Sequence, residues 1–383
     1  MHELRKFVVP EVVFGEGASS LCDRYALNFG SERPLIVTDP GIIATGLVDT
    51  LRASLAAAGL SPEVFSGIRA NPRDVQVQDG CDFYRAKKCD IIIGVGGGSP
   101  MDCAKAIGIL AANGGSVSGF EGIDNVDIPG PPLICIPTTA GTSADISQFA
   151  IINDTRRHLK FAIISKTTVP DVALIDPAPT RTMNPYLAAC TGIDALVHAI
   201  EACVSTASSP ITDLHALEAV RVIAANLEAS VQDARNENAR EALMYASMQA
   251  GMAFSNASLG VVHAMAHSLG GLLDLPHGEC IALLLAPAIE LNFDRARDKY
   301  IAVARAAGIP AEALGNGQAA EALIDWISRL LERVGIAPGL ASRGVRKETI
   351  PLLAQNAVSD PCAVTNPMPL DSELIQRLYE RAL

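Results

Sequence analysis

The first half of the chain alternates short apolar runs with helical stretches, and this alternation constrains the fold more than any other feature. Such strands, separated by helices of 10–15 residues, predict βαβ units and a parallel sheet. The run "DIIIGV" is apolar at successive positions, which is typical of a strand covered on both faces. The strand-like runs lie in residues 34–39, 62–67, 89–99 and 131–139, and the helical patterns lie in residues 46–60, 72–88 and after Pro100.

Beyond residues 177–185 the β-branched runs disappear, and Ala, Leu, Glu and Met recur at helical spacing. This change favours a second region built from helices alone. We therefore expect an α/β domain over residues 1–180 and an all-helical domain over residues 181–383.

The composition argues against nucleic acid and membranes as partners. The 383 residues are 49% hydrophobic and carry a formal net charge of −12. Nucleic acid and anionic membranes attract clustered Lys and Arg, so an acidic chain does not suit them. No run of 18 uncharged apolar residues indicates a membrane span, and the nearest candidate, residues 257–273, contains two histidines.

The cysteines and the first residues of the chain indicate a cytoplasmic protein. The nine cysteines are scattered, their number is odd, and none form a CxxC pair. This pattern favours reduced thiols over a disulfide framework or a zinc–thiolate site. The start of the chain has neither the apolar core nor the small-residue cleavage signal of a secretory leader.

A glycine-rich turn, "GVGGGSPMD" (residues 94–102), follows one expected strand and opens a helix. We expect Ser99 to cap that helix, Pro100 to occupy its first position and Asp102 to complete a capping box. Free N–H groups at such a helix start form an anion site that suits a pyrophosphate. The turn matches neither GxGxxG nor the P-loop pattern, so a purely structural turn remains an alternative.

Polar residues end two other expected strands. Asp39 follows "PLIVT", where a carboxylate can accept hydrogen bonds from a ribose diol and repel a 2′-phosphate. Thr138, Thr139 and Thr142 follow "PPLICIP" and offer small donors for a phosphate or ribose. Together with the glycine-rich turn, these strand ends favour a dinucleotide site.

The helical half places ionisable residues on apolar stretches. Asp194 and His198 are four residues apart, as are His263 and His267, and His277 follows Pro276. Buried carboxylates and imidazoles need partners, and this ligand set suits Fe(II), Zn(II), Mn(II) or Ni(II). A satisfied core histidine is the alternative for any one of them, and the spacing leaves open whether His263 and His267 bind one metal. Ala264 after His263 excludes the metalloprotease motif HExxH.

These segments resemble the iron-containing (group III) alcohol dehydrogenases, which include lactaldehyde:propanediol and 1,3-propanediol oxidoreductases. The resemblance covers essentially the whole chain and rests on "GVGGGSPMDCAKAIG", "IPTTAGTSADIS", "TGIDALVHAIEA", "GMAFSNASLGVVHAMAHSLGG", "PHGE" and "DPCAVTNP". It implies a Rossmann-like N-terminal dinucleotide-binding domain, a helical C-terminal domain and an active site in the cleft between them. The implied reaction is the NAD-dependent interconversion of a primary alcohol or diol and its aldehyde.

The resemblance also implies roles for individual residues. His267 would be a further active-site histidine near the nicotinamide that does not bind the metal, and Phe254 would line the substrate channel. Iron is the metal it favours, although zinc or manganese would suit the same ligands. The implied metal ligands are Asp194, His198, His263 and His277, and the implied cofactor positions are Asp39, Asn71, Gly97, Gly98, Ser99, Asp102, Thr138, Thr139, Thr142 and Lys160.

Three positions depart from the pattern of many family members, which have Glu at Asp145, Thr at Ser147 and Arg at Met368. The alternatives are a glycerol-dehydrogenase-like or dehydroquinate-synthase-like enzyme, an HD-type metal phosphohydrolase, and a metal-bound regulatory relative with little turnover. The expected partner is a small alcohol or aldehyde, and the apolar helices are compatible with a homodimer or larger assembly.

Overall fold

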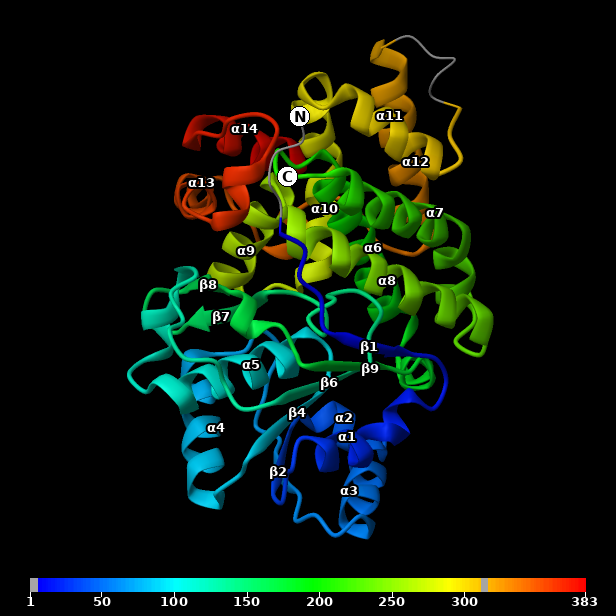
Figure 1. Ribbon diagram of the computed structural model, residues 1–383. Helices are drawn as coiled ribbons and strands as arrows, with labels where there is room; N and C mark the ends of the chain where they lie inside the picture. The colour runs from blue at the N-terminus through cyan, green and yellow to red at the C-terminus, as the bar shows by residue number, and fades with distance from the viewer. Residues whose placement is uncertain (1–5, 311–315) are drawn as a thin grey trace. The chain divides into compact units, whose positions relative to one another are not determined.

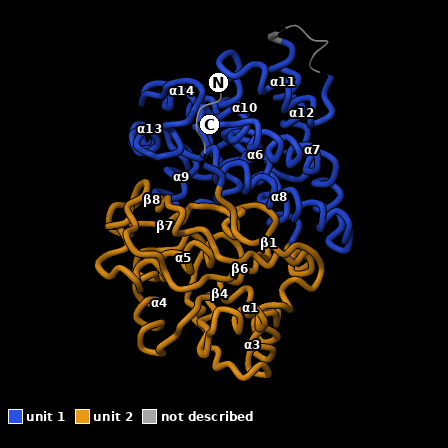
Figure 2. The backbone as a smooth tube through the Cα atoms, viewed as in Figure 1, with its two compact units in different colours: residues 1–7, 184–383 blue, residues 8–183 orange. Residues whose placement is uncertain are grey.

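The computed structural model describes residues 6–310 and 316–383 (Figure 1). The chain divides into two compact units (Figure 2). One unit comprises residues 8–183, and the other comprises residues 184–383 together with the described residues before Val8.

The first unit contains a six-stranded sheet in which every neighbouring pair is parallel. The strand order is β1-β9-β6-β4-β2-β3, and helices lie between β2 and β3, between β3 and β4, and between β4 and β6 along the chain. The parallel sheet and the helical second unit confirm the expected fold class. The strands are β1 (Glu11–Phe14), β2 (Pro34–Val37), β3 (Glu63–Phe65), β4 (Ile91–Gly96), β6 (Leu133–Pro137) and β9 (Val172–Ile175).

Alternate side chains of this sheet enter two different cores. Leu35 and Ile92 belong to a core with α4 (Asp74–Lys87) and α5 (Gly98–Asn113) on one face. Ile36 and Ile93 pack on the other face with α1 (Cys22–Asn28) and α3 (Leu47–Ala57). Helices on both faces explain why the strands are continuously apolar.

A small second sheet, which the sequence did not lead us to expect, joins the same unit. Strands β7 (Phe149–Asp154) and β8 (Leu159–Ile164) form an antiparallel hairpin, and β5 (Gly122–Ile123) pairs with β8. The side chain of Lys105, on α5, is fully buried and fastens the start of this hairpin. Its ammonium group donates to the carbonyl oxygens of Ser147, at 2.8 Å, and Phe149, at 2.7 Å.

The second unit consists of helices. One of them, α6 (Pro185–Val204), is long and apolar enough to span a membrane, but 89% of its most apolar window is buried inside the protein. It is therefore a core helix, and the stretch around residues 257–273 forms the shorter apolar helix α9 (Val261–Leu273). Among the described residues of this unit, the other α-helices are α7 (Pro210–Gln232), α8 (Glu237–Ala257), α10 (His277–Asn292), α11 (Arg297–Ala306), α12 (Asn316–Arg333), α13 (Ile350–Val358) and α14 (Ser372–Ala382).

All nine cysteines are buried and none forms a disulfide. Burial raises the pKa of Cys22 to about 12 and that of Cys190 to about 11. The thiols therefore serve as small apolar side chains.

Replacing Lys105 with Met should destabilise the first unit, because two buried carbonyl oxygens then lose a charged donor. We expect the free energy of unfolding, measured with urea, to fall by about 3 kcal/mol. The control is Lys87→Met, since the Lys87 side chain is 45% exposed in its ion pair with Glu63. Equal effects of the two substitutions would contradict the structural role of Lys105.

Candidate functional site

The first two candidate ligands lie on α6. Asn184 caps this helix by accepting a hydrogen bond from the Leu187 amide at 2.8 Å, and Pro185 occupies the first turn. Asp194 and His198 follow one turn apart and are only 2% and 4% exposed. The helix therefore presents a carboxylate and an imidazole from one face inside an apolar interior.

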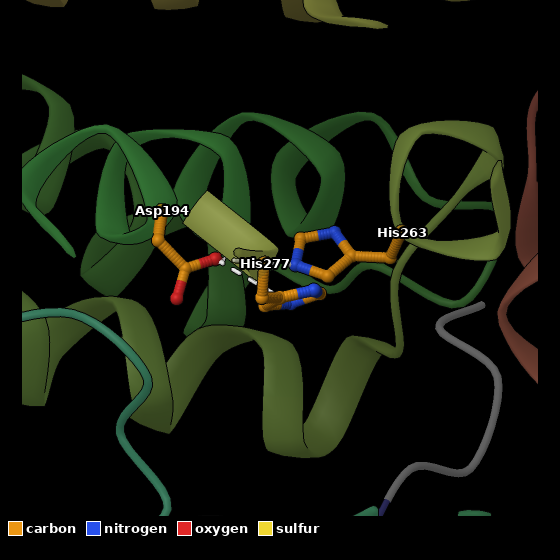
Figure 3. Close-up of side chains that lie close together, drawn as sticks. All are labelled: Asp194, His263 and His277. Carbon is orange, nitrogen blue, oxygen red and sulfur yellow. Dashed lines mark ion pairs between the residues drawn. The ribbon is translucent and has the colours of Figure 1, made fainter. Parts of the chain in front are cut away.

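Three histidines surround the Asp194 carboxylate. The distances from Asp194 Oδ1 to Nε2 are 3.8 Å for His198, 3.7 Å for His263 and 3.8 Å for His277. Figure 3 shows Asp194, His263 and His277 converging on one point. These residues come from α6, α9 and α10, so the tertiary fold assembles the donor set.

Two of these donor atoms are buried without a hydrogen-bond partner. They are Asp194 Oδ1 and His263 Nε2, which face each other. A buried polar atom left unpaired costs about 1–3 kcal/mol, so the arrangement is unfavourable unless a cation completes it. Carboxylate and imidazole donors at this spacing fit a divalent transition metal.

The electrostatic environment favours positive charge at this point. Burial would raise the pKa of Asp194, but the neighbouring imidazoles, His198 first, hold it far below its ordinary value. Burial would lower the pKa of His263, but its contacts with Asp194 and Glu201 outweigh burial and raise the pKa to about 9. A proton or a metal ion can supply that charge.

Glu201 orients His263, a role that we did not expect from the sequence. Its Oε2 lies 2.6 Å from His263 Nδ1, and its Oε1 accepts a hydrogen bond from the Val262 amide at 2.7 Å. An Nδ1–H that donates to Glu201 leaves Nε2 with the lone pair directed at the donor set. The available signal was spacing, since Glu201 lies two turns after Asp194 on the same helix.

The start of α9 is fixed by two side chains. Asn366 Oδ1 accepts a hydrogen bond from the Val261 amide at 3.1 Å, beside the bond from Val262 to Glu201. Gly260, the N-cap, lies so close that an added Cβ would be 2.8 Å from Glu201 Oε1 and 3.0 Å from Asn366 Oδ1. Glycine is required there by this close approach.

His267 lies next to the donor set but has a different carboxylate partner. Its ring stacks on that of His277 with centroids 5.3 Å apart. Its Nδ1 lies 2.8 Å from Asp360 Oδ2, and Asp360 Oδ1 accepts a hydrogen bond from the Cys362 amide at 2.8 Å. Burial would raise the pKa of Asp360, but the contacts with His267 and with Cys362 lower it, so Asp360 is an anion beside this imidazole.

Phe254, expected along a substrate channel, contacts a candidate ligand. Its ring stacks on the His198 imidazole with centroids 4.2 Å apart and an interplanar angle of 18°. The side chain is 4% exposed. The contact shown therefore restricts the orientation of His198.

The glycine-rich turn lies at the carboxyl end of β4, and one detail of our expectation for it is wrong. Helix α5 begins at Gly98 with Gly97 as its N-cap, so Ser99 is not the cap and Pro100 is not the first helical residue. No side chain caps the helix, so Asp102 does not complete a capping box either. The helix starts earlier because two glycines can follow the strand where side chains would clash. The free N–H groups in the first turn of α5 still lie at the end of β4, as an anion site requires.

The threonines after β6 contact this turn directly. A Cβ on Gly97 would lie 3.3 Å from Thr139 Oγ1, and one on Gly98 would lie 3.0 Å from Thr142 Cγ2. The Thr138 amide donates to the Gly96 carbonyl oxygen at 2.9 Å, and Thr138 Oγ1 is buried without a partner. The structure thus brings two of the predicted strand ends together.

Asp39 lies at the same edge of the sheet. Its Oδ1 caps α2 (Pro40–Ala44) by accepting a hydrogen bond from Ile42, and its Oδ2 would lie 3.5 Å from a Cβ on Gly96. Asn71 is buried, with a positive φ of 55°. The convergence of β2, β4 and β6 at one edge is typical of a dinucleotide site.

Asp102 and Lys160 form part of a charged group beneath the turn. Burial raises the pKa of the Asp102 carboxyl to about 7, against the opposing effects of Lys105, the Ile151 amide and Lys160. Lys160 lies on β8, opposite Asn153 of β7.

The three departures from the family pattern occupy defined places. Asp145 is buried, and burial raises its pKa to about 6, while the Ser147 carbonyl oxygen binds Lys105. The Met368 carbonyl oxygen accepts from Asn366 Nδ2 at 2.7 Å. None of these three residues belongs to the Asp194 donor set.

Comparison with known proteins identifies the family. Residues 10–177 match the family described as "Iron-containing alcohol dehydrogenase", and residues 188–383 match "Fe-containing alcohol dehydrogenase family, C-terminal". The chain belongs to the iron-containing alcohol dehydrogenase family. It is an oxidoreductase, a metal-dependent alcohol dehydrogenase, and NAD and iron are typical of its family.

Individual relatives match along nearly their whole length. The 1,3-propanediol dehydrogenase of Citrobacter freundii is 39% identical over 98% of this chain and 98% of its own. The NAD-dependent methanol dehydrogenase of Bacillus methanolicus is 36% identical over 98% of this chain and 99% of its own. A crystal structure of 1,3-propanediol oxidoreductase covers 100% of both chains with a TM-score of 0.96 and 38% identity.

Gly260→Ala should weaken metal binding about 10- to 100-fold, because the new methyl group displaces the carboxylate that orients His263. The measurement is the dissociation constant of Zn²⁺ for the metal-free protein. Gly119→Ala is the control, since a Cβ there meets no atom within 4 Å. Unchanged affinity in Gly260→Ala would contradict the role given to Glu201.

Asp102→Asn should change how stability depends on pH. The Asp102 carboxyl has a pKa of about 7 in the folded protein and an ordinary pKa of 3.8 when the chain is unfolded. Between these two pH values the folded state therefore binds more protons than the unfolded state does. Wild-type stability should therefore fall, relative to Asp102→Asn, as pH rises from about 4 to about 7, by at most about 4 kcal/mol. Urea unfolding at several pH values measures this, and the exposed control is Asp79→Asn; parallel pH profiles for wild type and Asp102→Asn would refute the shift.

Proposed function

We propose that the protein is an NAD-dependent dehydrogenase that interconverts a primary alcohol or diol and its aldehyde, with Fe(II) held by Asp194, His198, His263 and His277. The observation that carries this proposal is the pair of buried, unpartnered atoms Asp194 Oδ1 and His263 Nε2, 3.7 Å apart. Zinc or manganese suits the same donors.

When bound, the metal supplies Lewis-acid polarisation of the alcohol oxygen, and NAD supplies the hydride acceptor. The protein supplies positions and charges. Asp194 contributes one negative charge, the imidazoles contribute neutral donors, and Glu201 keeps His263 in the tautomer with Nε2 free. Phe254 restricts rotation of His198.

His267 is the proposed proton carrier. Its Nδ1 is occupied by Asp360, so Nε2 can accept the proton that the alcohol loses and return it in the reverse direction. The Asp360 carboxylate stabilises the imidazolium that forms. His267 is paired with Asp360 and not with Asp194, and this separate carboxylate partner supports a role outside the metal.

The NAD site is proposed at the carboxyl edge of the parallel sheet. The amides after Gly97 and Gly98 bind the pyrophosphate, with Ser99 and Asp102 in the same turn. Asp39 binds the adenosine ribose and disfavours a 2′-phosphate. The remaining proposed cofactor residues are Asn71, Thr138, Thr139, Thr142 and Lys160.

Small alcohols and aldehydes fit the family as substrates. We further propose that the enzyme is cytoplasmic and works as a homodimer or larger homo-oligomer without nucleic acid or membrane partners. Its buried cysteines, none of them in a disulfide, support the compartment, and its formal net charge of −12 argues against nucleic acid and anionic membranes.

The test is anaerobic reconstitution with Fe(II), followed by a screen for NAD reduction over short alcohols and diols and by metal analysis. His263→Ala should lose bound metal, whereas His267→Ala should keep metal and lose about 10²- to 10⁴-fold in kcat. Equal loss of metal in both variants would contradict the division of roles. No NAD reduction with any substrate, despite bound metal and NAD, would refute the proposed function.

A further inference from the structure

The candidate ligand His277 differs from the other three in its place in the fold. It is the first residue of α10, directly after Pro276, and no side chain caps that helix. Its side chain is 25% exposed, against 5% for His198 and 1% for His263. A ligand at a helix end, where residues fray, needs other contacts to keep its position.

The first contact is with the backbone of α6. A Cβ on Gly278 would lie 2.5 Å from the Cys190 carbonyl oxygen and 2.8 Å from its carbonyl carbon. Glycine therefore lets the start of α10 rest directly on α6, one turn before Asp194. This contact fixes the separation of the two helices but leaves rotation of α10 to other groups.

Glu279 provides the second contact. Its Oε1 accepts a hydrogen bond from Arg343 Nε at 2.8 Å, and both side chains are largely buried, at 13% and 14% exposed. Tyr186, in the first turn of α6, is near enough to Glu279 that partial burial and this carboxylate raise the pKa of Tyr186. Glu279, on the helix of His277, is therefore also close to the helix of Asp194.

Arg343 is itself held rigidly. Its Nη2 donates to the Ala337 carbonyl oxygen at 2.7 Å, and its Nη1 donates to those of Pro338 and Gly339 at 3.1 and 2.9 Å. The guanidinium therefore binds the backbone carbonyl oxygens of residues 337–339 and directs its Nε–H at Glu279. A planar donor with several hydrogen bonds resists displacement better than a flexible ammonium does.

We infer that Glu279 and Arg343 are positioning residues for the metal site, which set the place of His277 relative to Asp194; this inference rests on the proposed function. Neither residue touches the donor atoms. They act through the first turn of α10, so removing the pair loosens one ligand out of four and leaves the other three in place.

The experiment measures Zn²⁺ affinity of the metal-free protein by competition with a chromophoric chelator. Arg343→Met and Glu279→Gln should each bind Zn²⁺ about 10- to 100-fold more weakly, and Arg343→Lys should lie between Arg343→Met and wild type. Glu279→Gln keeps the side chain's shape, so it tests the pair even where Arg343→Met does not fold. The control is Arg333→Met, because Arg333 makes an ion pair of the same length, 2.8 Å, with Glu228, although both side chains are 41% exposed.

The outcomes separate this inference from the proposed function. Wild-type affinity equal to that of Asp194→Ala would mean that the donor set binds no metal, and the proposed function would fail. Tight wild-type binding with unchanged affinity in Arg343→Met and Glu279→Gln would overturn the positioning role alone. An equal loss in Arg333→Met would also overturn it, since the effect would then be a general consequence of losing an ion pair.

Discussion

The helical unit depends on one buried carboxylate, that of Glu201. One of its oxygens caps α9 through Val262 and the other holds the His263 ring, so helix position and ligand orientation are set by the same group. Gly260 makes room for it, and Asn366 completes the cap. A local change here cannot remain local, because backbone and imidazole share their acceptor.

The α/β unit solves a comparable problem with the opposite charge. Lys105 is buried, and its ammonium group binds two carbonyl oxygens at the start of β7, with Asp102 and Asp145 nearby. In both units several hydrogen bonds compensate the free-energy cost of burying a charged side chain, as buried charges require. Glu201 contacts the candidate ligand His263, and Lys105 lies on the helix that begins at the glycine-rich turn. Each buried charge therefore limits how far the residues proposed to bind a ligand can move.

The parallel sheet and the helical second half could be predicted from the sequence because apolar runs and helical spacing are local patterns. Histidines on apolar stretches indicated where candidate ligands lie, but only the family resemblance implied which of them bind a metal. The β7–β8 hairpin was missed, although two apolar runs flank the polar stretch Thr155–His158. The cap at Ser99 was wrong because the local preference for serine was overridden by the close packing of Gly98 against Thr142. The pairing of Asp360 with His267 spans 93 residues, so only the tertiary structure reveals it.

The nine buried cysteines can report local unfolding of the protein. A thiol reacts as an exposed thiolate, and burial denies these side chains both conditions. Cys22 and Cys103 lie in the α/β unit, whereas Cys203 and Cys362 lie in the helical unit, each 0–1% exposed. The rate at which any one of them is alkylated therefore reports how often the structure around it unfolds. Local unfolding of the two units can be measured separately in this way.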